Sequence, residues 1–205
     1  MALANYTDLL ASVASWMHRS DLTSVIPDMV VVAESRIARD LRIRRQITAG
    51  TLTTTANTQS TALPTDFLEA ENLSISSGGV NRNLEYVNVE RMDLAYPVGS
   101  GNGVPVVYTF EGASVLWGPV PDAAYTVSLY YYARLTALAT TSTNWLLTNY
   151  PDVYLFSTLA ECADYVNDKA NFAKWEAKYK QAVTELQISD NASMFSGSAI
   201  RVRTI

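Results

Sequence analysis

Residues 143–183 constrain the fold of this chain more than any other segment. Asn144 is a typical N-cap residue for a short helical turn, and Pro151 is typical of the first turn of the helix that follows. Apolar residues then recur at helical spacing on either side of Asn167-Asp168-Lys169: Leu155, Leu159, Cys162 and Val166, then Phe172, Trp175, Tyr179, Val183 and Leu186. Because the link is so short, the two helices are predicted to pack antiparallel, with the aromatic stripe in the core.

The N-terminal residues predict two more helices. Helical spacing over about three turns relates Tyr6, Leu9, Leu10, Val13, Trp16 and Met17. Pro27 suits the first turn of a second helix, whose apolar stripe is Ile26, Val30, Ala33, Ile37 and Leu41. Val31 and Val32 project away from that stripe, and a helix with apolar residues on two sides usually has two neighbours.

Between the helical segments the sequence is rich in Thr, Val, Tyr and Gly, which favour strands and turns. Residues 125–134 alternate between an apolar and a more polar set, and Val106, Tyr108 and Phe110 alternate likewise. Glu111-Gly112-Ala113 predicts a turn into a strand over residues 114–117. The segment is therefore predicted to form a small antiparallel β-sandwich or barrel.

Together these patterns predict an α+β fold in which N- and C-terminal helical hairpins close into one four-helix bundle with the β part inserted. The predicted boundaries are 1–45 for the first helices, 46–135 for the β domain, 136–188 for the C-terminal hairpin and 189–205 for an extended tail. Ser189-Asp190-Asn191 is predicted to stop the last helix.

Composition points toward a partner-bound protein. Of the 205 residues, 48% are hydrophobic and only 17% are charged, against about 25% in typical soluble domains. A chain with so little charge is expected to hide some surface in a partner. The formal net charge of -5 is carried by residues 46–135, where three arginines face eight acids.

Signatures of chemistry are missing from the sequence. It has no phosphate-binding glycine-rich loop, and its single histidine, His18, and single cysteine, Cys162, support neither a metal site nor a catalytic pair. We therefore expect no catalytic residue, metal or cofactor. The N-terminus has no secretion signal and no segment is apolar enough to span a membrane, so synthesis in the cytoplasm is expected.

Two features are candidate contact surfaces. Five arginines fall within ten residues at the end of the second predicted helix: Arg36, Arg39, Arg42, Arg44 and Arg45. They suit a solvated helix end, an acidic protein surface or DNA phosphates. The tail carries Phe195 and the alternating run Ile200, Arg201, Val202 and Arg203, which suits either a frayed terminus or a strand added to the edge of another protein.

Several motifs, in order along nearly the whole chain, resemble phage head-to-tail adaptor proteins, also called head-tail connectors, and are similar to the tail tubular protein A or gatekeeper type. Residues 143–147 (TNWLL), 150–155 (YPDVYL), and Trp175-Glu176 with Tyr179 resemble the C-terminal hairpin of that family. Its β part is similar to residues 63–69 (LPTDFLE) and to 116–122 (LWGPVPD) leading into 130–132, and its second helix to 34–42 (ESRIARDLR).

The resemblance implies a structural virion protein at the head-tail junction, made in the host cytoplasm. It implies a ring, usually of twelve copies, below the portal protein, with a tail or nozzle protein beneath and DNA passing transiently through the channel. The arginine cluster and the tail would then contact the portal or a neighbouring subunit, or the arginines would ring the DNA.

Two alternatives stay open on the sequence. A tail-associated binding module would account for the aromatic residues and the Thr-rich strands. A peptidoglycan-degrading virion hydrolase would use carboxylates among Asp66, Glu69 and Glu71.

Overall fold

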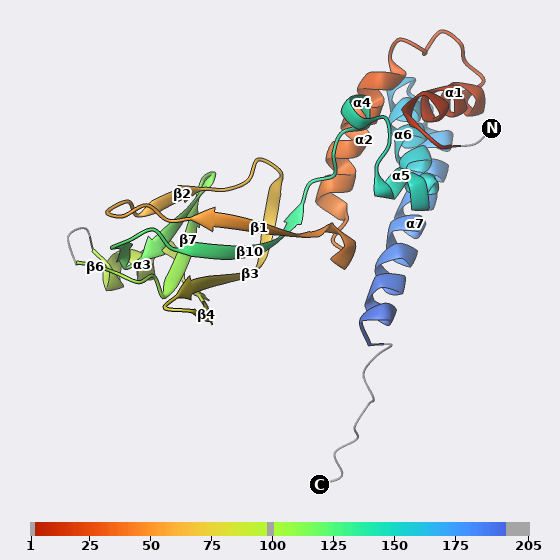
Figure 1. The fold of residues 1–205 in the computed structure, drawn as a ribbon. Coiled ribbons are helices and arrows are strands. Elements are labelled where there is room, and N and C mark those ends of the chain that lie inside the picture. Colours follow the sequence, from red (N-terminus) through yellow and green to blue (C-terminus); the bar gives the residue numbers. More distant parts are fainter. Residues whose placement is uncertain (1–2, 98–100, 196–205) are drawn as a thin grey trace. The chain divides into compact units, whose positions relative to one another are not determined.

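The computed structural model describes residues 3–97 and 101–195, the last two as backbone only (Figure 1). The chain divides into two compact units. The helical unit consists of Met1–Ile43 and Leu135–Ile205, and the β unit is Arg44–Arg134.

Six helices of the described residues belong to the helical unit: α1 (Tyr6–Met17), α2 (Ile26–Asp40), α4 (Leu138–Thr141), α5 (Trp145–Asn149), α6 (Pro151–Tyr165) and α7 (Lys169–Phe195). Local signals explain where several of them begin. The Asn5 side chain accepts a hydrogen bond from the Asp8 backbone N–H at 3.0 Å, and Asn144 does the same for Leu147 at 3.0 Å. The predicted starts at Pro27 and Pro151 are confirmed, since each proline lies in the first turn of its helix.

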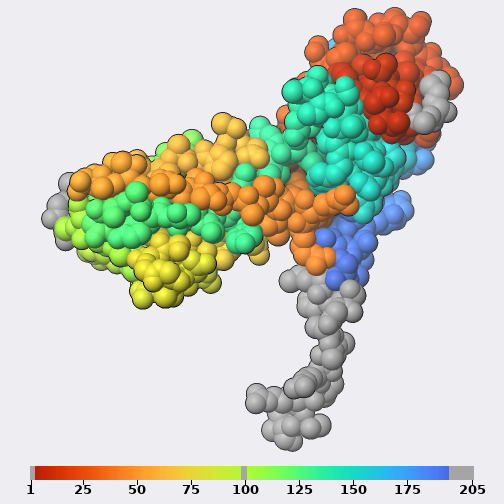
Figure 2. Space-filling view, viewed as in Figure 1, coloured from red at the N-terminus to blue at the C-terminus, as the bar shows by residue number. Residues whose placement is uncertain are grey.

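Helix α6 lies at the centre of the helical unit, with α1, α2, α5 and α7 packed against it. Nine of its 15 residues are buried, including the small side chains of Ser157, Ala160 and Ala163. The predicted antiparallel pair of α6 and α7 shares a core in which Trp175, Tyr179 and Val183 are buried. Residues 135–150, teal in Figure 2, cover part of the face that the view shows.

The predicted four-helix bundle is wrong. The segment between the β unit and α6 forms two further short helices, α4 and α5, whose residues Leu138, Leu146 and Leu147 are fully buried. A bundle predicted from four amphipathic stripes misses them because segments of four and five residues show no helical periodicity. Helix α6 is buried on almost every side, whereas a helix at the corner of a bundle buries one stripe.

Helix α7 continues to Phe195 through Ser189-Asp190-Asn191, so the predicted stop is also wrong. Hydroxyl side chains in this region bond back to the helix, with Thr184 Oγ1 donating to the Lys180 carbonyl at 2.7 Å and Ser193 Oγ to that of Asp190 at 2.8 Å. Ser, Asp and Asn are neutral to unfavourable inside helices but are not excluded from them, so this short polar run does not by itself end α7.

The β unit contains two four-stranded sheets. The first has the order β1 (Ile47–Thr53), β10 (Thr126–Ala133), β3 (Phe67–Ser77), β4 (Val80–Asn83), all antiparallel. The second has the order β2 (Ser60–Ala62), β8 (Ser114–Gly118), β7 (Val107–Glu111), β5 (Glu85–Tyr86). Shorter elements are η1 (Arg44–Gln46), α3 (Val89–Ala95) and the strands β6 (Asn102–Gly103) and β9 (Val120–Pro121), which pair with each other.

The alternation predicted for β10 is confirmed, because Val127, Leu129 and Tyr131 are buried in a core to which both sheets contribute. The hairpin between β7 and β8 is also confirmed, with Gly112 at the turn in the left-handed region at a φ of 57°. At the centre of this core Trp117 is fully buried, and its Nε1 donates to Thr61 Oγ1 at 2.9 Å.

The predicted small antiparallel sandwich or barrel is wrong. Strands β5 and β7 are parallel, as are β6 and β9, and the sheets are larger than expected. Between β5 and β7 the chain passes through α3, and a connection of that kind is what parallel strands require. Alternation along a strand reveals which side chains are buried but not which way the neighbouring strand runs.

Candidate interaction surfaces

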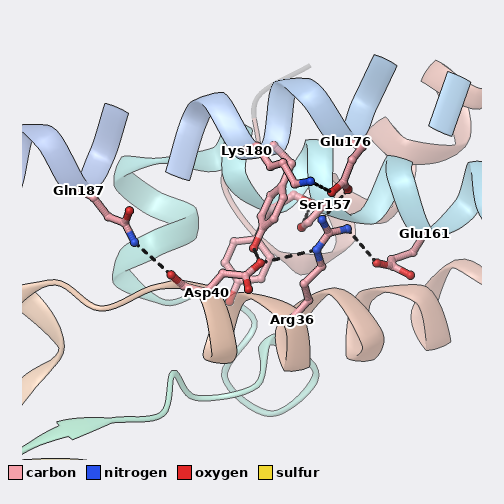
Figure 3. Close-up of polar contacts among 9 residues, drawn as sticks. Arg36, Asp40, Ser157, Glu161, Glu176, Lys180 and Gln187 are labelled. Atoms are coloured by element: carbon pink, nitrogen blue, oxygen red, sulfur yellow. Dashed lines mark hydrogen bonds and ion pairs between the residues drawn. The ribbon is translucent and has the colours of Figure 1, made fainter. Parts of the chain in front are cut away.

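Arg36 joins three helices through its guanidinium group (Figure 3). Its Nη1 lies 3.3 Å from Glu161 Oε1 of α6, and its Nη2 bonds Glu176 of α7. Its Nε lies 3.7 Å from Asp40 Oδ2, and the group stacks over the Tyr179 ring at 4.4 Å from its centre. The sequence placed Arg36 among the candidate partner contacts. In the structure its guanidinium group contacts residues of its own chain.

The same cluster continues along α7. The Tyr179 hydroxyl donates to Asp40 Oδ2 at 2.8 Å, Lys180 Nζ lies 3.0 Å from Glu176 Oε1, and Gln187 Nε2 donates to the Asp40 carbonyl at 3.0 Å. Burial raises the pKa of Tyr179, and the bond to Asp40 adds to the rise. Burial alone would raise the pKa of Glu176, but Arg36 and Lys180 outweigh it and lower that pKa.

The other four arginines do not gather on one unit. Arg39 and Arg42 belong to the helical unit, and Arg44 and Arg45 to the first turn of the β unit. Arg42 Nη1 donates to the carbonyls of Ala38 and Leu41 at 2.7 and 2.8 Å, which caps the end of α2. The side chains of Arg39, Arg44 and Arg45 are exposed. Their contact with a partner stays a prediction.

Ile200, Arg201, Val202 and Arg203 lie outside the described residues, and Phe195 is described only as the end of α7.

A second surface, missed by the sequence interpretation, runs along α6 and α7. The rings of Trp16, Phe156 and Trp175 meet there, with Trp16 to Trp175 at 5.5 Å and Phe156 stacked on Trp175 at 6.0 Å between centroids. Lys174 Nζ lies 4.2 Å from the centre of the Trp175 ring, and Lys178 Nζ lies 5.1 Å from that of Phe156. Trp16 remains 46% exposed, so the patch is open to solvent on its α1 side.

Hollows flank this aromatic patch on either side. One of about 180 Å³ lies between α6 and α7 and is lined by Asp152, Phe156, Lys178, Gln181, Ala182 and Glu185. Another of about 200 Å³ is lined by residues of α1 and α6 together with Leu3. Lys174, Lys178 and Glu185 are spaced so that they share one face of α7. This spacing is the sequence signal that could have revealed the surface.

The outward side of α2 is a third surface. Val31 is 55% exposed and Val32 43% exposed, on the side of the helix away from the buried Val30, Ala33 and Ile37. Within the described chain α2 contacts α1, α6 and α7, but its Val31 and Val32 side faces solvent.

The structure also places the residues that the sequence offered as candidates for catalysis or metal binding. Asp66 Oδ1 accepts a hydrogen bond from the Tyr131 hydroxyl at 3.0 Å, and Glu69 and Glu71 are exposed on β3. His18 ends α1 in the left-handed conformation, and Cys162 is buried, which raises the pKa of its thiol to about 12. Within residues 3–97 and 101–195 no three His, Cys, Asp or Glu side chains are grouped as metal ligands, and no helix is long and apolar enough to cross a membrane.

Comparison with known proteins identifies the family. The family described as SU10 adaptor protein matches residues 4–203, which is nearly the whole chain. No curated protein matches the sequence. The match covers both the helical and the β unit, in agreement with the resemblance found in the motifs. The chain therefore belongs to the SU10 adaptor protein family, a family of phage head-to-tail adaptors.

Proposed function

We propose that this protein is the subunit of a closed ring, of twelve copies, that joins the portal of a phage head to the tail and lets DNA pass. The observation that carries the proposal is the family match over residues 4–203. The open surfaces on α2 and on α6 and α7 support it, since a single chain leaves large apolar side chains exposed on both.

The partners in this proposal are the portal protein above, further copies of the chain at each side, and a tail or nozzle protein below. The exposed Arg44 and Arg45 are the described residues best suited to an acidic portal surface, and the exposed Arg39 suits an acidic side chain of a neighbouring copy. The tail residues Phe195, Ile200, Arg201, Val202 and Arg203 would add a second contact. Arg36 instead supports the ring indirectly, because it fixes α2 against α6 and α7.

Passage of DNA in this proposal is transient and independent of sequence. The β unit has five arginines against eight acids, and the whole chain has a formal net charge of -5. DNA-binding proteins gain affinity by neutralising phosphates, so an acidic ring favours passage over retention.

The role that we propose is structural, and the protein would be part of the virion. The hydrolase alternative gains no support from Asp66, which is bonded to Tyr131, or from the exposed Glu69 and Glu71. No observation favours the binding-module alternative over the adaptor role.

The proposal is tested by mixing the purified protein with its cognate portal and averaging electron micrographs of the particles. We expect a ring of cyclic symmetry on one face of the portal. A chain ending at residue 195 separates the contributions of the tail and the arginines, and we expect it to bind the portal more weakly. Full-length protein that stays separate from the portal would contradict the proposed function.

A further inference from the structure

We propose that neighbouring copies in the ring meet through two different faces of the helical unit: the outward stripe of α2 in one copy and the groove between α6 and α7 in the next. This inference rests on the proposed ring and names the surfaces that close it. It is carried by the arrangement of charges and apolar side chains on α2 and α7.

The α7 side of this contact is one straight stripe. Lys174, Lys178, Gln181 and Glu185 are spaced by four, three and four residues, so they share one side of the helix, and all four are exposed. The stripe borders the 180 Å³ hollow, to which α6 contributes Asp152 and Phe156. Its order of charge is positive toward the start of α7 and negative at Glu185.

The α2 stripe has the opposite order of charge over the same length. Asp28 lies at its start, Val31, Val32 and Ser35 in the middle, and Arg39 at its end, all exposed. Asp28 and Arg39 are 11 residues apart, as are Lys174 and Glu185, which is about 16 Å along a helix. With the two helices parallel, Asp28 meets Lys174 and Arg39 meets Glu185, while Val32 lies level with Lys178 at the edge of the hollow.

Cyclic symmetry makes α2 of one copy run parallel to α7 of the next, as the proposed pairing requires. Within one chain α2 and α7 run parallel, because Arg36 contacts Glu176 while Asp40, later on α2, contacts Gln187, later on α7. A rotation about an axis along these helices preserves their direction, so α2 of one copy and α7 of the next are also parallel. The charges of the two stripes are complementary in this direction and repulsive in the reverse one.

The two faces are separate, so that one chain can use both at once. Glu176, which faces Arg36, is two residues from Lys174 and thus about 200° around α7 from the stripe. On α6, Phe156 in the groove and Glu161 beside Arg36 are about 140° apart. A contact between two different faces is heterologous, which is the kind that closes into rings.

The test is disulfide cross-linking of portal-bound rings with paired cysteine substitutions. Two matched pairs, Asp28→Cys with Lys174→Cys and Arg39→Cys with Glu185→Cys, test the register. Two mismatched pairs, Asp28→Cys with Glu185→Cys and Arg39→Cys with Lys174→Cys, are the controls. The native Cys162 is buried and its thiol pKa is raised to about 12, so it does not compete.

We expect both matched pairs to give a ladder of cross-linked multimers, at least about tenfold faster than the mismatched pairs, because a disulfide needs Cα atoms within about 7 Å. Faster cross-linking of the mismatched pairs, or cross-links only within single chains, would overturn the inference. If rings form on the portal and no pair cross-links, the inference fails and the proposed ring stands. If no ring forms, both fail.

A charge exchange tests the same contact without cysteines. Arg39→Glu places a carboxylate opposite Glu185, and we expect it to weaken self-association about fivefold. Adding Glu185→Arg restores the attraction, and self-association should return to within about twofold of the unchanged protein. Arg19→Glu, an exposed charge outside both faces, is the control. No loss with Arg39→Glu, or no recovery in the double variant, would contradict the pairing of Arg39 with Glu185.

Discussion

The guanidinium group of Arg36 lies 4.4 Å from the centre of the Tyr179 ring, and the hydroxyl of that ring donates to Asp40, one turn beyond Arg36 on α2. One aromatic side chain of α7 therefore contacts α2 at two successive turns. Only 15% of the Arg36 side chain is exposed, and Glu161 and Glu176 beside it are 19% and 18% exposed. Arg36 has the sequence features of a surface residue. In the folded chain it links three helices.

Replacing Arg36 with leucine should destabilise the helical unit. The change leaves the poorly exposed carboxylates of Glu161 and Glu176 without their main cation, at a cost of about 2–3 kcal/mol in the free energy of unfolding. Chemical denaturation followed by circular dichroism measures it. Arg19→Leu is the matched control, since its partner Asp21 is exposed, and it should leave the free energy of unfolding nearly unchanged. Equal losses in the two variants would contradict the role given to Arg36.

Acid should weaken the same cluster. The folded chain lowers the pKa of Glu176 below its usual value of about 4.3, so the ionised form is favoured more in the folded state than in the unfolded state. The stabilisation is present at neutral pH and is lost as the pH falls below about 4.3 and through the folded pKa. Thermal unfolding between pH 7 and pH 3 should show a steeper loss for the unchanged protein than for Glu176→Gln. Parallel curves would show that Glu176 does not contribute.

Gly118 in the β unit should not accept a side chain. A Cβ at this position would lie 2.7 Å from Met92 Sδ, from Tyr96 Cδ2 and from Val107 Cγ2. Overpacking of this kind costs about 1–3 kcal/mol, so Gly118→Ala should lower the free energy of unfolding by that amount. Gly103→Ala is the control, because its Cβ would meet only Pro119 Cγ, at 3.4 Å. A neutral Gly118→Ala would mean that Met92, Tyr96 and Val107 do not lie against Gly118 in solution.

Cys162 should resist thiol reagents in the folded protein. It is 2% exposed, and burial raises its thiol pKa to about 12, so the reactive thiolate is scarce at neutral pH. Labelling with a chromogenic disulfide should be at least about a hundredfold slower in buffer than in denaturant. The cysteine introduced by Asp28→Cys serves as the exposed reference on the same chain. Fast labelling of Cys162 in buffer would show that the core around α6 opens.

Local sequence signals predicted several helix starts and the buried side of one strand. Asn144 forms the side-chain cap predicted for it, and Pro27 and Pro151 lie in first helical turns. The alternation of residues 125–134 identified the buried side of β10. These signals depend on neighbours within a few residues, so a single sequence contains them in full. The end of α7 was missed because a short polar run lowers helix propensity without necessarily ending a helix.

The assembly of those elements depended on distant residues. No short-range pattern shows that α6 is enclosed by its neighbours or that β5 runs parallel to β7. The residues that form the candidate surfaces also depend on partners that are distant in the sequence. Arg36 was grouped with its neighbouring arginines, whereas its carboxylate partners lie 125 and 140 residues further along the chain.

The sequence by itself determined the helix starts, the buried face of β10, the lack of recognisable catalytic motifs and, through its motifs, the adaptor family. Only the tertiary structure decided which charged side chains are enclosed and which line open surfaces. The physical reason is that an arginine has the same local pattern in both settings, and its surroundings are set by helices brought together from opposite ends of the chain.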